Sequence, residues 1–282
     1  MNIVKTIEEV RNQVNAWKNE GYSIALVPTM GYLHEGHASL IKRAASENQK
    51  IVVSIFVNPI QFGPSEDLAS YPRDLDKDAI LCKGAGANLI FAPEASEMYY
   101  TDAQTNVSVN GLTKGLCGAK RPGHFNGVCT VVSKLFNIVC ADKAYFGEKD
   151  AQQLAVIKRM VRDLNFPIEI IGCPIVREDD GLAKSSRNNY LSTDERAAAL
   201  ILSKSLNSAK QLLLTHEKSA EFLKETIRKQ IQSEVLAKID YIEVVDALSL
   251  TTIELIDKPV LVAIAVYIGK TRLIDNFIWH SK

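Results

Sequence analysis

The sequence contains little cysteine. Only five cysteines occur among the 282 residues, and no two of them form a Cys-x-x-Cys pair. This scarcity argues against a framework of disulfides and against a zinc site made of thiolates. We therefore expect mostly buried free thiols, a cytoplasmic location with reducing conditions, and no metal site made by the protein itself.

An excess of charge of one sign is also missing. The chain carries 33 basic and 33 acidic side chains, and no run of lysine or arginine stands out. Binding of nucleic acid through a charged surface is therefore not expected, although a balanced total is compatible with a local basic patch inside a cleft. No apolar run is long enough to cross a membrane, and residues 1–17 do not resemble a signal peptide. We expect neither nucleic acid nor a membrane among its partners.

Short apolar runs alternate with helical patterns through residues 1–176. A capping box at Thr6 and Glu9 predicts a helix to about residue 20. Runs of strand length occupy residues 22–28, 51–57, 88–93, 143–147 and 168–176, and helical spacing occupies residues 37–48, 75–86, 126–139 and 151–164. Strands that are apolar throughout and alternate with helices predict an α/β fold, with a Rossmann-like doubly wound parallel sheet.

The pattern changes after Val176. A polar stretch is followed by two long helical segments between Thr193 and about Leu236, and then by three strand-like runs at residues 239–247, 259–268 and 271–279. Successive strands without helices between them indicate an antiparallel sheet. We therefore predict two domains, residues 1–176 and a smaller C-terminal α+β lid domain of residues 177–282.

Two glycines and two histidines follow the first apolar run, in the segment "TMGYLHEGH". Where a strand turns into a helix, the unpaired N–H groups of the helix start bind anions. Gly31 and Gly36 would let a nucleotide approach the backbone, and His34 and His37 could donate to phosphate oxygens. Zinc is the competing interpretation, but no His-Glu-x-x-His motif and no cysteine cluster accompany them. Two exposed loop histidines are the other alternative.

Polar side chains follow later strands of the predicted sheet as well. Asn58 and Gln61 come after the second strand, where amides suit a small molecule with hydroxyls, although an ordinary Asn-Pro turn is the alternative. Lys149 opens a helix, an electrostatically poor place for a cation, which favours a role with an anion over a solvated lysine. Arg121 and His124 lie in a glycine-bearing loop that fits either a turn or a mobile anion-binding loop.

Residues 184–187 gather hydrogen-bond donors without a carboxylate. Lys184, Ser185, Ser186 and Arg187 form a set suited to phosphate, and a flexible linker between domains is the alternative. Since the carboxyl ends of parallel strands meet at one edge of a sheet, we expect these donors and those above to converge on one ligand.

The ordered set of motifs resembles the pantothenate synthetase family of pantoate–β-alanine ligases. The match runs through "PTMGYLHEGH", "FVNPIQF", "YPRDLDKD", "RPGHFNGV", "FGEKDAQQL" and "SSRN", and it covers essentially the whole first domain and its junction. The His-x-Gly-His motif alone is shared with other nucleotidyltransferases and class I aminoacyl-tRNA synthetases. The ordered set is far more specific.

The resemblance implies a reaction in two steps with ATP and Mg²⁺. Pantoate attacks the α-phosphate of Mg-ATP to give pantoyl adenylate and pyrophosphate, and β-alanine then displaces AMP to give pantothenate. The family is typically a homodimer, so the resemblance also implies a second copy of this chain as a partner.

The resemblance also implies roles for particular residues. Catalysis falls to His37, described as the acid in the family, and to His34, Lys149 and Arg187, while Asn58, Gln61 and Gln153 would hold pantoate. The ATP site would be formed by Met30, Gly31, Tyr32, Leu33, His34, His37, Gly147, Glu148, Lys149, Asp150, Val176, Lys184, Ser185, Ser186 and Arg187.

Two positions depart from the family pattern. Lys184 stands where leucine or methionine is usual, and it would either contact a phosphate or point into solvent; Ile60 replaces a common threonine. A cytidylyltransferase acting on a phosphorylated acceptor is the alternative function, but it would not need Gln61 and Gln153. A tRNA synthetase would need more basic surface, and a simple binding module does not explain why donors recur after successive strands.

Overall fold

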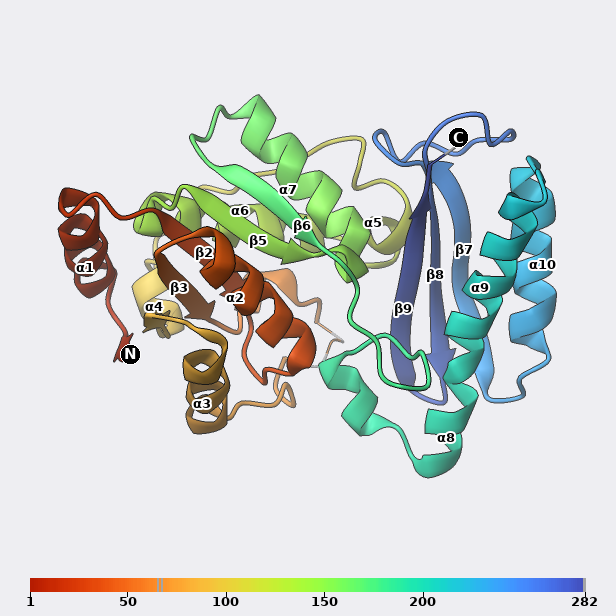
Figure 1. Cartoon of the computed structure of the whole chain (residues 1–282), viewed down its shortest axis with the longest axis horizontal. Helices are drawn as coiled ribbons and strands as arrows, with labels where there is room; N and C mark the ends of the chain where they lie inside the picture. Colours follow the sequence, from red (N-terminus) through yellow and green to blue (C-terminus); the bar gives the residue numbers. More distant parts are fainter. Residues whose placement is uncertain (65, 67, 281–282) are drawn as a thin grey trace.

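Two β-sheets with flanking helices make up the computed structural model, which describes residues 1–64, 66 and 68–280 (Figure 1). The strands are β1 (Asn2–Val4), β2 (Ile24–Thr29), β3 (Lys50–Ile55), β4 (Leu89–Phe91), β5 (Lys143–Gly147), β6 (Glu169–Cys173), β7 (Ala237–Asp246), β8 (Val260–Ile268) and β9 (Thr271–Trp279). The α-helices are α1 (Ile7–Asn19), α2 (Glu35–Glu47), α3 (Leu75–Ala85), α4 (Ala95–Met98), α5 (Leu116–Lys120), α6 (His124–Val139), α7 (Ala151–Asp163), α8 (Thr193–Ala198), α9 (Leu200–Leu214) and α10 (Ala220–Gln232). Three short 3₁₀ helices are η1 (Pro59–Gln61), η2 (Glu148–Asp150) and η3 (Ser186–Tyr190).

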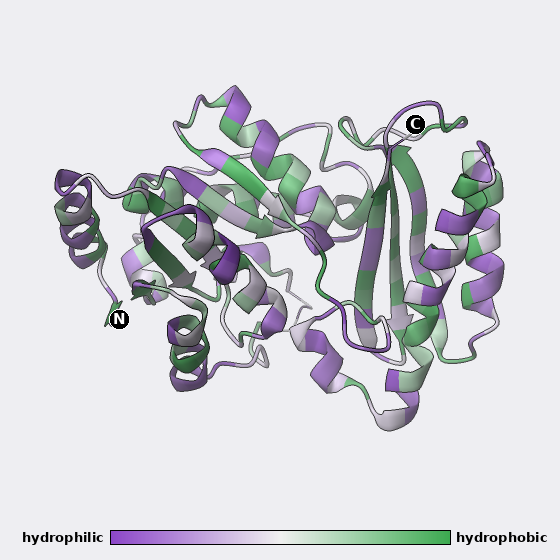
Figure 2. Cartoon of the chain, in the orientation of Figure 1, coloured by the Kyte–Doolittle hydropathy of each residue, from purple (hydrophilic) through white to green (hydrophobic). Residues whose placement is uncertain are grey.

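The first six strands form one parallel sheet in the order β1-β4-β3-β2-β5-β6. Helices α1, α6 and α7 pack on one face, where Val10 and Val14 join the core. Helices α2 and α3 pack on the other face through Leu40, Ile41 and Cys82. Burial on both faces explains why these strands read as continuous apolar runs (Figure 2). The predicted doubly wound α/β fold is confirmed.

Strands β7, β8 and β9 form a separate antiparallel sheet, as predicted. Alternate residues of the central strand β8, such as Val262 and Ile264, pack under α9 and α10. Leu261 and Ala263 point to the opposite face, where Leu116 of α5 meets them. The strand therefore has no polar face, and the second sheet is packed against an element that precedes it by more than a hundred residues.

Three details of the sequence interpretation were wrong or incomplete. The edge strand β1 was missed, because three residues give no periodicity. Residues 193–236 form three helices rather than two: α8 ends next to Ala199 with no glycine or proline to mark the break, and α9 ends before His216, which has a φ of 67°. The short helices α4 and α5 were also not anticipated.

The sheet reverses its winding direction between β2 and β5, which are neighbours in the sheet but far apart in the sequence. In doubly wound folds, ligands bind beyond the carboxyl ends of the strands at such a switch point. The segment "TMGYLHEGH" leaves β2 here, and the segment "GEKD" leaves β5 beside it. The predicted boundary between residues 176 and 177 lies between β6 and α8 and stays a prediction.

Candidate active site

A cavity of about 240 Å³ lies at this switch point and joins a larger one of about 740 Å³ that extends toward β8 and β9. Most of the predicted site residues line the smaller cavity: Met30, His34, His37, Asn58, Gln61, Gly147, Lys149, Asp150, Gln153, Val176, Lys184, Ser185, Ser186 and Arg187. Gly31, Tyr32, Leu33 and Glu148 do not. Four strand ends thus deliver their polar side chains to one place, as their order in the sequence suggested.

The two histidines cap the start of α2 with their own rings. Nδ1 of His34 accepts the N–H of Gly36 at 3.1 Å, and Nδ1 of His37 accepts the N–H of His34 at 3.3 Å. Since each Nδ1 accepts, each Nε2 carries the proton. The expectation of unpaired backbone N–H groups at this helix start was therefore wrong for Gly36. The imidazole Nε2–H groups are the donors that these two contacts leave for a ligand.

Gly36 is required by the cap itself. A Cβ at this position would lie 2.8 Å from Cε1 of His34, so any larger residue would displace the capping imidazole. The sequence interpretation assigned this glycine to the approach of a nucleotide. In the structure, glycine is needed at this position because the backbone packs closely against the ring of His34.

Both imidazoles are neutral at physiological pH. Burial, followed by the charge of Lys149, lowers the pKa of His34 to about 4. Burial, followed by the neighbouring His34, lowers the pKa of His37 to about 3. The two ring centroids lie 4.1 Å apart. In the absence of a ligand, these side chains therefore act as hydrogen-bond donors and not as cations.

Asp78 on α3 orients the loop between β2 and α2, and sequence reasoning missed it. Its carboxylate accepts the N–H groups of Tyr32 at 2.8 Å and Leu33 at 2.6 Å, and its side chain is 2% exposed. Gly31 has a φ of 82° and its Cβ position lies 3.0 Å from Asp78 Oδ2. The backbone of residues 32 and 33 therefore faces α3 rather than the cavity. Asp78 ends the motif "YPRDLDKD", so the motif marked this residue, but the helical pattern did not indicate the contact.

A chain of amide contacts fixes the side chain of Gln61. Nδ2 of Asn58 donates to Oε1 of Gln61 at 3.0 Å, and the hydroxyl of Tyr99 donates to Oδ1 of Asn58 at 2.8 Å. The Gln61 amide nitrogen then faces Sδ of Met30 at 3.1 Å, on the wall of the cavity. Because Asn58 occupies the oxygen, Gln61 presents N–H donors to the cavity. Tyr99 was not anticipated as a member of this site.

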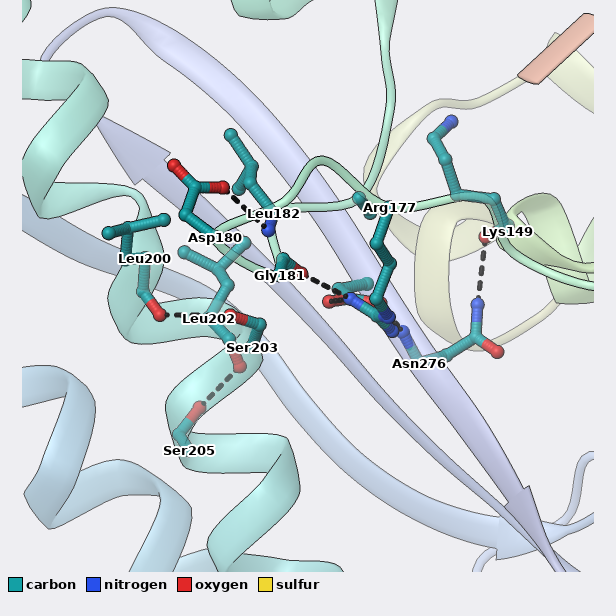
Figure 3. Close-up of polar contacts among 12 residues, drawn as sticks. Lys149, Arg177, Asp180, Gly181, Leu182, Leu200, Leu202, Ser203, Ser205 and Asn276 are labelled. Carbon is teal, nitrogen blue, oxygen red and sulfur yellow. Dashed lines mark hydrogen bonds and ion pairs between the residues drawn. The ribbon is translucent and has the colours of Figure 1, made fainter. Parts of the chain in front are cut away.

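The antiparallel sheet holds the backbone next to Lys149. Nδ2 of Asn276 on β9 donates to the carbonyls of Glu148 at 3.1 Å and Lys149 at 2.8 Å, and Figure 3 shows the side chain of Lys149 on the opposite side from this bond. Arg177 forms two bonds, at 2.7 and 2.9 Å, with the buried Asp275 of the same strand. Asn276 of the antiparallel sheet thus fixes the backbone of Lys149, which follows strand β5 of the parallel sheet.

Lys149 and Lys184 both carry acidic partners. Nζ of Lys149 lies 3.1 Å from Asp150, and although burial alone would raise the pKa of Asp150, the charge of Lys149 keeps it below its usual value. Lys184 forms an ion pair with Glu35 and lies 3.9 Å from Glu178. In this structure Lys184 therefore bridges α2 and the segment after β6, and a phosphate contact stays a prediction.

The whole chain matches known ligases. A family model described as pantoate-beta-alanine ligase matches residues 2–278. The chain belongs to the pantoate–β-alanine ligase family. The pantothenate synthetase of Clostridium acetobutylicum is 65% identical over 280 residues, which are 99% of this chain and 100% of that protein. The resemblance based on ordered motifs is thereby confirmed.

Solved structures of the ligase family share both sheets. The pantothenate synthetase of Thermus thermophilus matches with a TM-score of 0.93 at 43% identity, over 98% of this chain and 99% of that one. The ligase of Francisella tularensis, solved in complex with beta-gamma ATP and beta-alanine, matches with a TM-score of 0.80 at 34% identity, over 99% of this chain and 97% of that one. The arrangement of a parallel sheet facing a smaller antiparallel one is thus that of the ligase family.

The neutral histidines of this ligase predict a loss of stability in mild acid. Imidazoles of the unfolded chain take up protons near pH 6.5, whereas His34 and His37 stay neutral in the folded chain down to about pH 4 and 3. The unfolded state then binds more protons, so the free energy of unfolding should fall as the pH drops from about 6.5 toward 4, with no contribution above that range. Urea midpoints measured between pH 7.5 and 4.5 would show this slope.

A variant isolates the contribution of one histidine. His37→Gln should show a shallower fall in urea midpoint over the same pH range, because one buried imidazole is gone. His216→Gln, at an exposed turn, is the matched control and should keep the slope of the original chain. Equal slopes for His37→Gln and the original chain would contradict the prediction.

Helices long and apolar enough to cross a membrane are absent from the described part of the chain. The same residues contain no group of three or more His, Cys, Asp or Glu side chains that could hold a metal ion.

Proposed function

We propose that this chain condenses D-pantoate with β-alanine at the expense of ATP. A carboxylate oxygen of pantoate attacks the α-phosphorus, and the bond to pyrophosphate breaks. The amine of β-alanine then attacks the acyl carbon, the bond to AMP breaks, and one amine proton leaves as the amide forms. Membership of the ligase family over residues 2–278 supports this reaction.

One observation carries the assignment to this cavity. Donors suited to phosphate and donors suited to hydroxyls and a carboxylate line the same cavity. The phosphate donors are the Nε2–H groups of His34 and His37, with Lys149 beside them; the others are the amides of Gln61 and Gln153. In an adenylation the carboxylate of the acid must lie beside the α-phosphate of ATP. The two sets of donors offer a binding place for each group.

The roles follow from the charge that develops during adenylation. Negative charge accumulates on the α-phosphate and on pyrophosphate, so fixed donors and cations lower the barrier without a covalent nucleophile. We assign Lys149, Ser185, Ser186 and Arg187 to the triphosphate and Gln61 to pantoate. Met30, Gly147 and Val176 would line the adenosine part of the site.

Mg²⁺ fits as an ion carried by the nucleotide. The described residues hold no cluster for a resident metal, whereas Asp150 lines the cavity and offers the hard carboxylate oxygens that Mg²⁺ prefers. When bound, Mg²⁺ would neutralise part of the triphosphate charge. Asp150 is the residue that would hold the ion, through its carboxylate.

Incubation of the purified chain with ATP, Mg²⁺ and D-pantoate, with and without β-alanine, tests the proposal. Pyrophosphate should form in the presence of pantoate, and pantothenate and AMP should appear together only when β-alanine is added. Absence of pantoate-dependent pyrophosphate would contradict the ligase assignment. CTP with phosphorylated acceptors would then be tested, because a cytidylyltransferase is the alternative.

Three further expectations accompany this function. We propose that the ligase acts in the cytoplasm, that it forms a homodimer, and that residues 177–282 act as a lid over the cavity. The bonds from Asn276 to the backbone of Glu148 and Lys149 support a coupling of this region to the site. Light scattering after size exclusion would test the dimer.

A further inference from the structure

One cation at the opening between the two cavities has no role in the assignments above. Arg121 lines both cavities. Its Nε and Nη2 donate to the two carboxylate oxygens of Glu66, each at 2.6 Å, and its Nη1 lies 3.0 Å from Nε2 of His124. The two side chains of this ion pair are 20% and 22% exposed, so the guanidinium is held in a fixed plane near the surface of the cavity.

His124 connects this guanidinium to the pantoate side of the site. Nδ1 of His124 lies 2.9 Å from the backbone carbonyl of Gln61. A carbonyl can only accept, so Nδ1 carries the proton and Nε2 accepts from Arg121. Burial, followed by the charge of Arg121, lowers the pKa of His124 to about 4, which keeps this tautomer at neutral pH. Arg121 therefore lies one imidazole ring away from the backbone of Gln61.

The guanidinium keeps donors for a ligand. Arginine has five N–H groups, and the contacts among the described residues use three of those on Arg121. One N–H on Nη1 and one on Nη2 remain beside these contacts. Two N–H groups on the two Nη atoms of a guanidinium can bond the two oxygens of a carboxylate.

We propose that these two N–H groups of Arg121 bind the carboxylate of β-alanine, an inference that rests on the proposed function. The amine of β-alanine must reach the acyl carbon beside Gln61 and Gln153, and its carboxylate is two methylene groups away. The carboxylate would then lie where the two cavities meet, beside Arg121, which lines both. Arg121 takes no part in the bond changes; it positions the amine by holding the other end of the molecule.

Position favours Arg121 over the other cations of the cavity. The proposed function assigns Lys149 and Arg187 to the triphosphate, and the charge of Lys149 acts on both histidines. Lys184 pairs with Glu35 in the first turn of α2. Arg121 is the cation that the hydrogen bonds of His124 tie to Gln61, within the part of the chain that the structure describes. A second substrate that enters through the larger cavity meets this guanidinium at the entrance to the pantoate pocket.

The test separates the two half-reactions. Pantoate-dependent exchange of pyrophosphate into ATP reports adenylation without β-alanine, and pantothenate formation reports the second step. Arg121→Gln should keep the exchange rate within about twofold and raise the KM for β-alanine about tenfold to a hundredfold, the effect of losing a charge-assisted hydrogen bond. Lys120→Gln is the matched control, since Lys120 lines the larger cavity and pairs with Asp240 at 3.4 Å. Its KM for β-alanine should not change.

Propylamine, which lacks the carboxylate of β-alanine, gives a readout that a purely structural role would not move. The original chain should prefer β-alanine over propylamine in kcat/KM, and Arg121→Gln should lose most of that preference. An unchanged preference, with both amines weakened equally, would overturn the proposal. Arg121→Lys keeps the charge but not the paired donors. Its preference for β-alanine over propylamine should lie between those of the original chain and Arg121→Gln.

The remaining outcomes of this experiment also decide for or against the proposal. If Arg121→Gln loses the exchange reaction, the preference is measured in Arg121→Lys, and loss of exchange in both variants would place Arg121 in the adenylation site and overturn the proposal. If the original chain shows no pantoate-dependent exchange at all, the proposed function itself fails. That result is distinct from a failure of the β-alanine site.

Discussion

Replacing Lys149 with alanine should lower the rate of pantoate-dependent pyrophosphate release by about a hundredfold to a thousandfold, the usual effect of removing one fixed donor from a developing charge. Its Nζ lies beside the two neutral histidines on the phosphate side of the cavity, and Asn276 holds the backbone on either side of its Cα. Rapid-quench measurement at saturating ATP and pantoate would give the rate of the chemical step. Alanine also removes the cation that pairs with Asp150, so the site becomes more negative by one charge.

A second measurement distinguishes a direct role from a general disturbance. The charge of Lys149 is among the causes that lower the pKa of His34 and His37, so both values should rise in Lys149→Ala when followed by NMR. Lys158→Ala changes an exposed lysine on α7, the helix that follows Lys149; it is the matched control and should keep the original rate. Full activity of Lys149→Ala would mean that this side chain does not meet the triphosphate.

Replacing Asp78 with asparagine should weaken both the fold and the nucleotide site. An amide can accept one of the N–H groups of Tyr32 and Leu33 through its oxygen, but its NH₂ group would face the other. Loss of a charge-assisted bond should lower the free energy of unfolding by about 1.5–3 kcal/mol. Because the loop carries Met30 and His34 at its ends, a shift of about 1 Å could reduce kcat/KM for ATP by up to about a hundredfold.

Urea unfolding and steady-state kinetics check the two halves of this prediction. Asp76→Asn removes the same charge from an exposed position of α3 and is the matched control. The free energy of unfolding of Asp76→Asn should fall by less than about 1 kcal/mol, the size of a helix-dipole effect at the first turn. If Asp78→Asn behaves like Asp76→Asn, the buried carboxylate does not hold the loop.

The sequence indicated which polar residues line one cavity, because they follow the ends of parallel strands within a few residues. His34 and His37 follow β2, Gln61 follows β3, and Lys149 follows β5. In a parallel sheet these ends meet at one edge, so their convergence is a consequence of topology and not of any single residue. The roles assigned to these residues stay predictions until the variants above are measured.

The residues that support the site could not be predicted in the same way. Glu66 and Asn276 lie outside the quoted motifs, and Asp78 ends the motif "YPRDLDKD" without a role assigned to it. Each of the three acts through a contact across a long sequence separation. Such contacts depend on how helices and sheets pack, which the spacing of apolar residues does not specify. The capping of α2 by imidazole rings was unexpected for a similar reason, since it depends on rotamers and burial.

By itself, the sequence determined the alternation of strands and helices, the change to antiparallel strands after residue 176, and the family, because periodicity and ordered motifs are local properties. Tertiary structure alone decided which N–H groups stay available to a ligand. It directed the backbone of Tyr32 and Leu33 to Asp78, left Nε2–H of His34 and His37 as donors, and oriented Arg121 between Glu66 and His124. The physical reason is that a donor's availability depends on every acceptor within about 3 Å, and those acceptors come from distant parts of the chain.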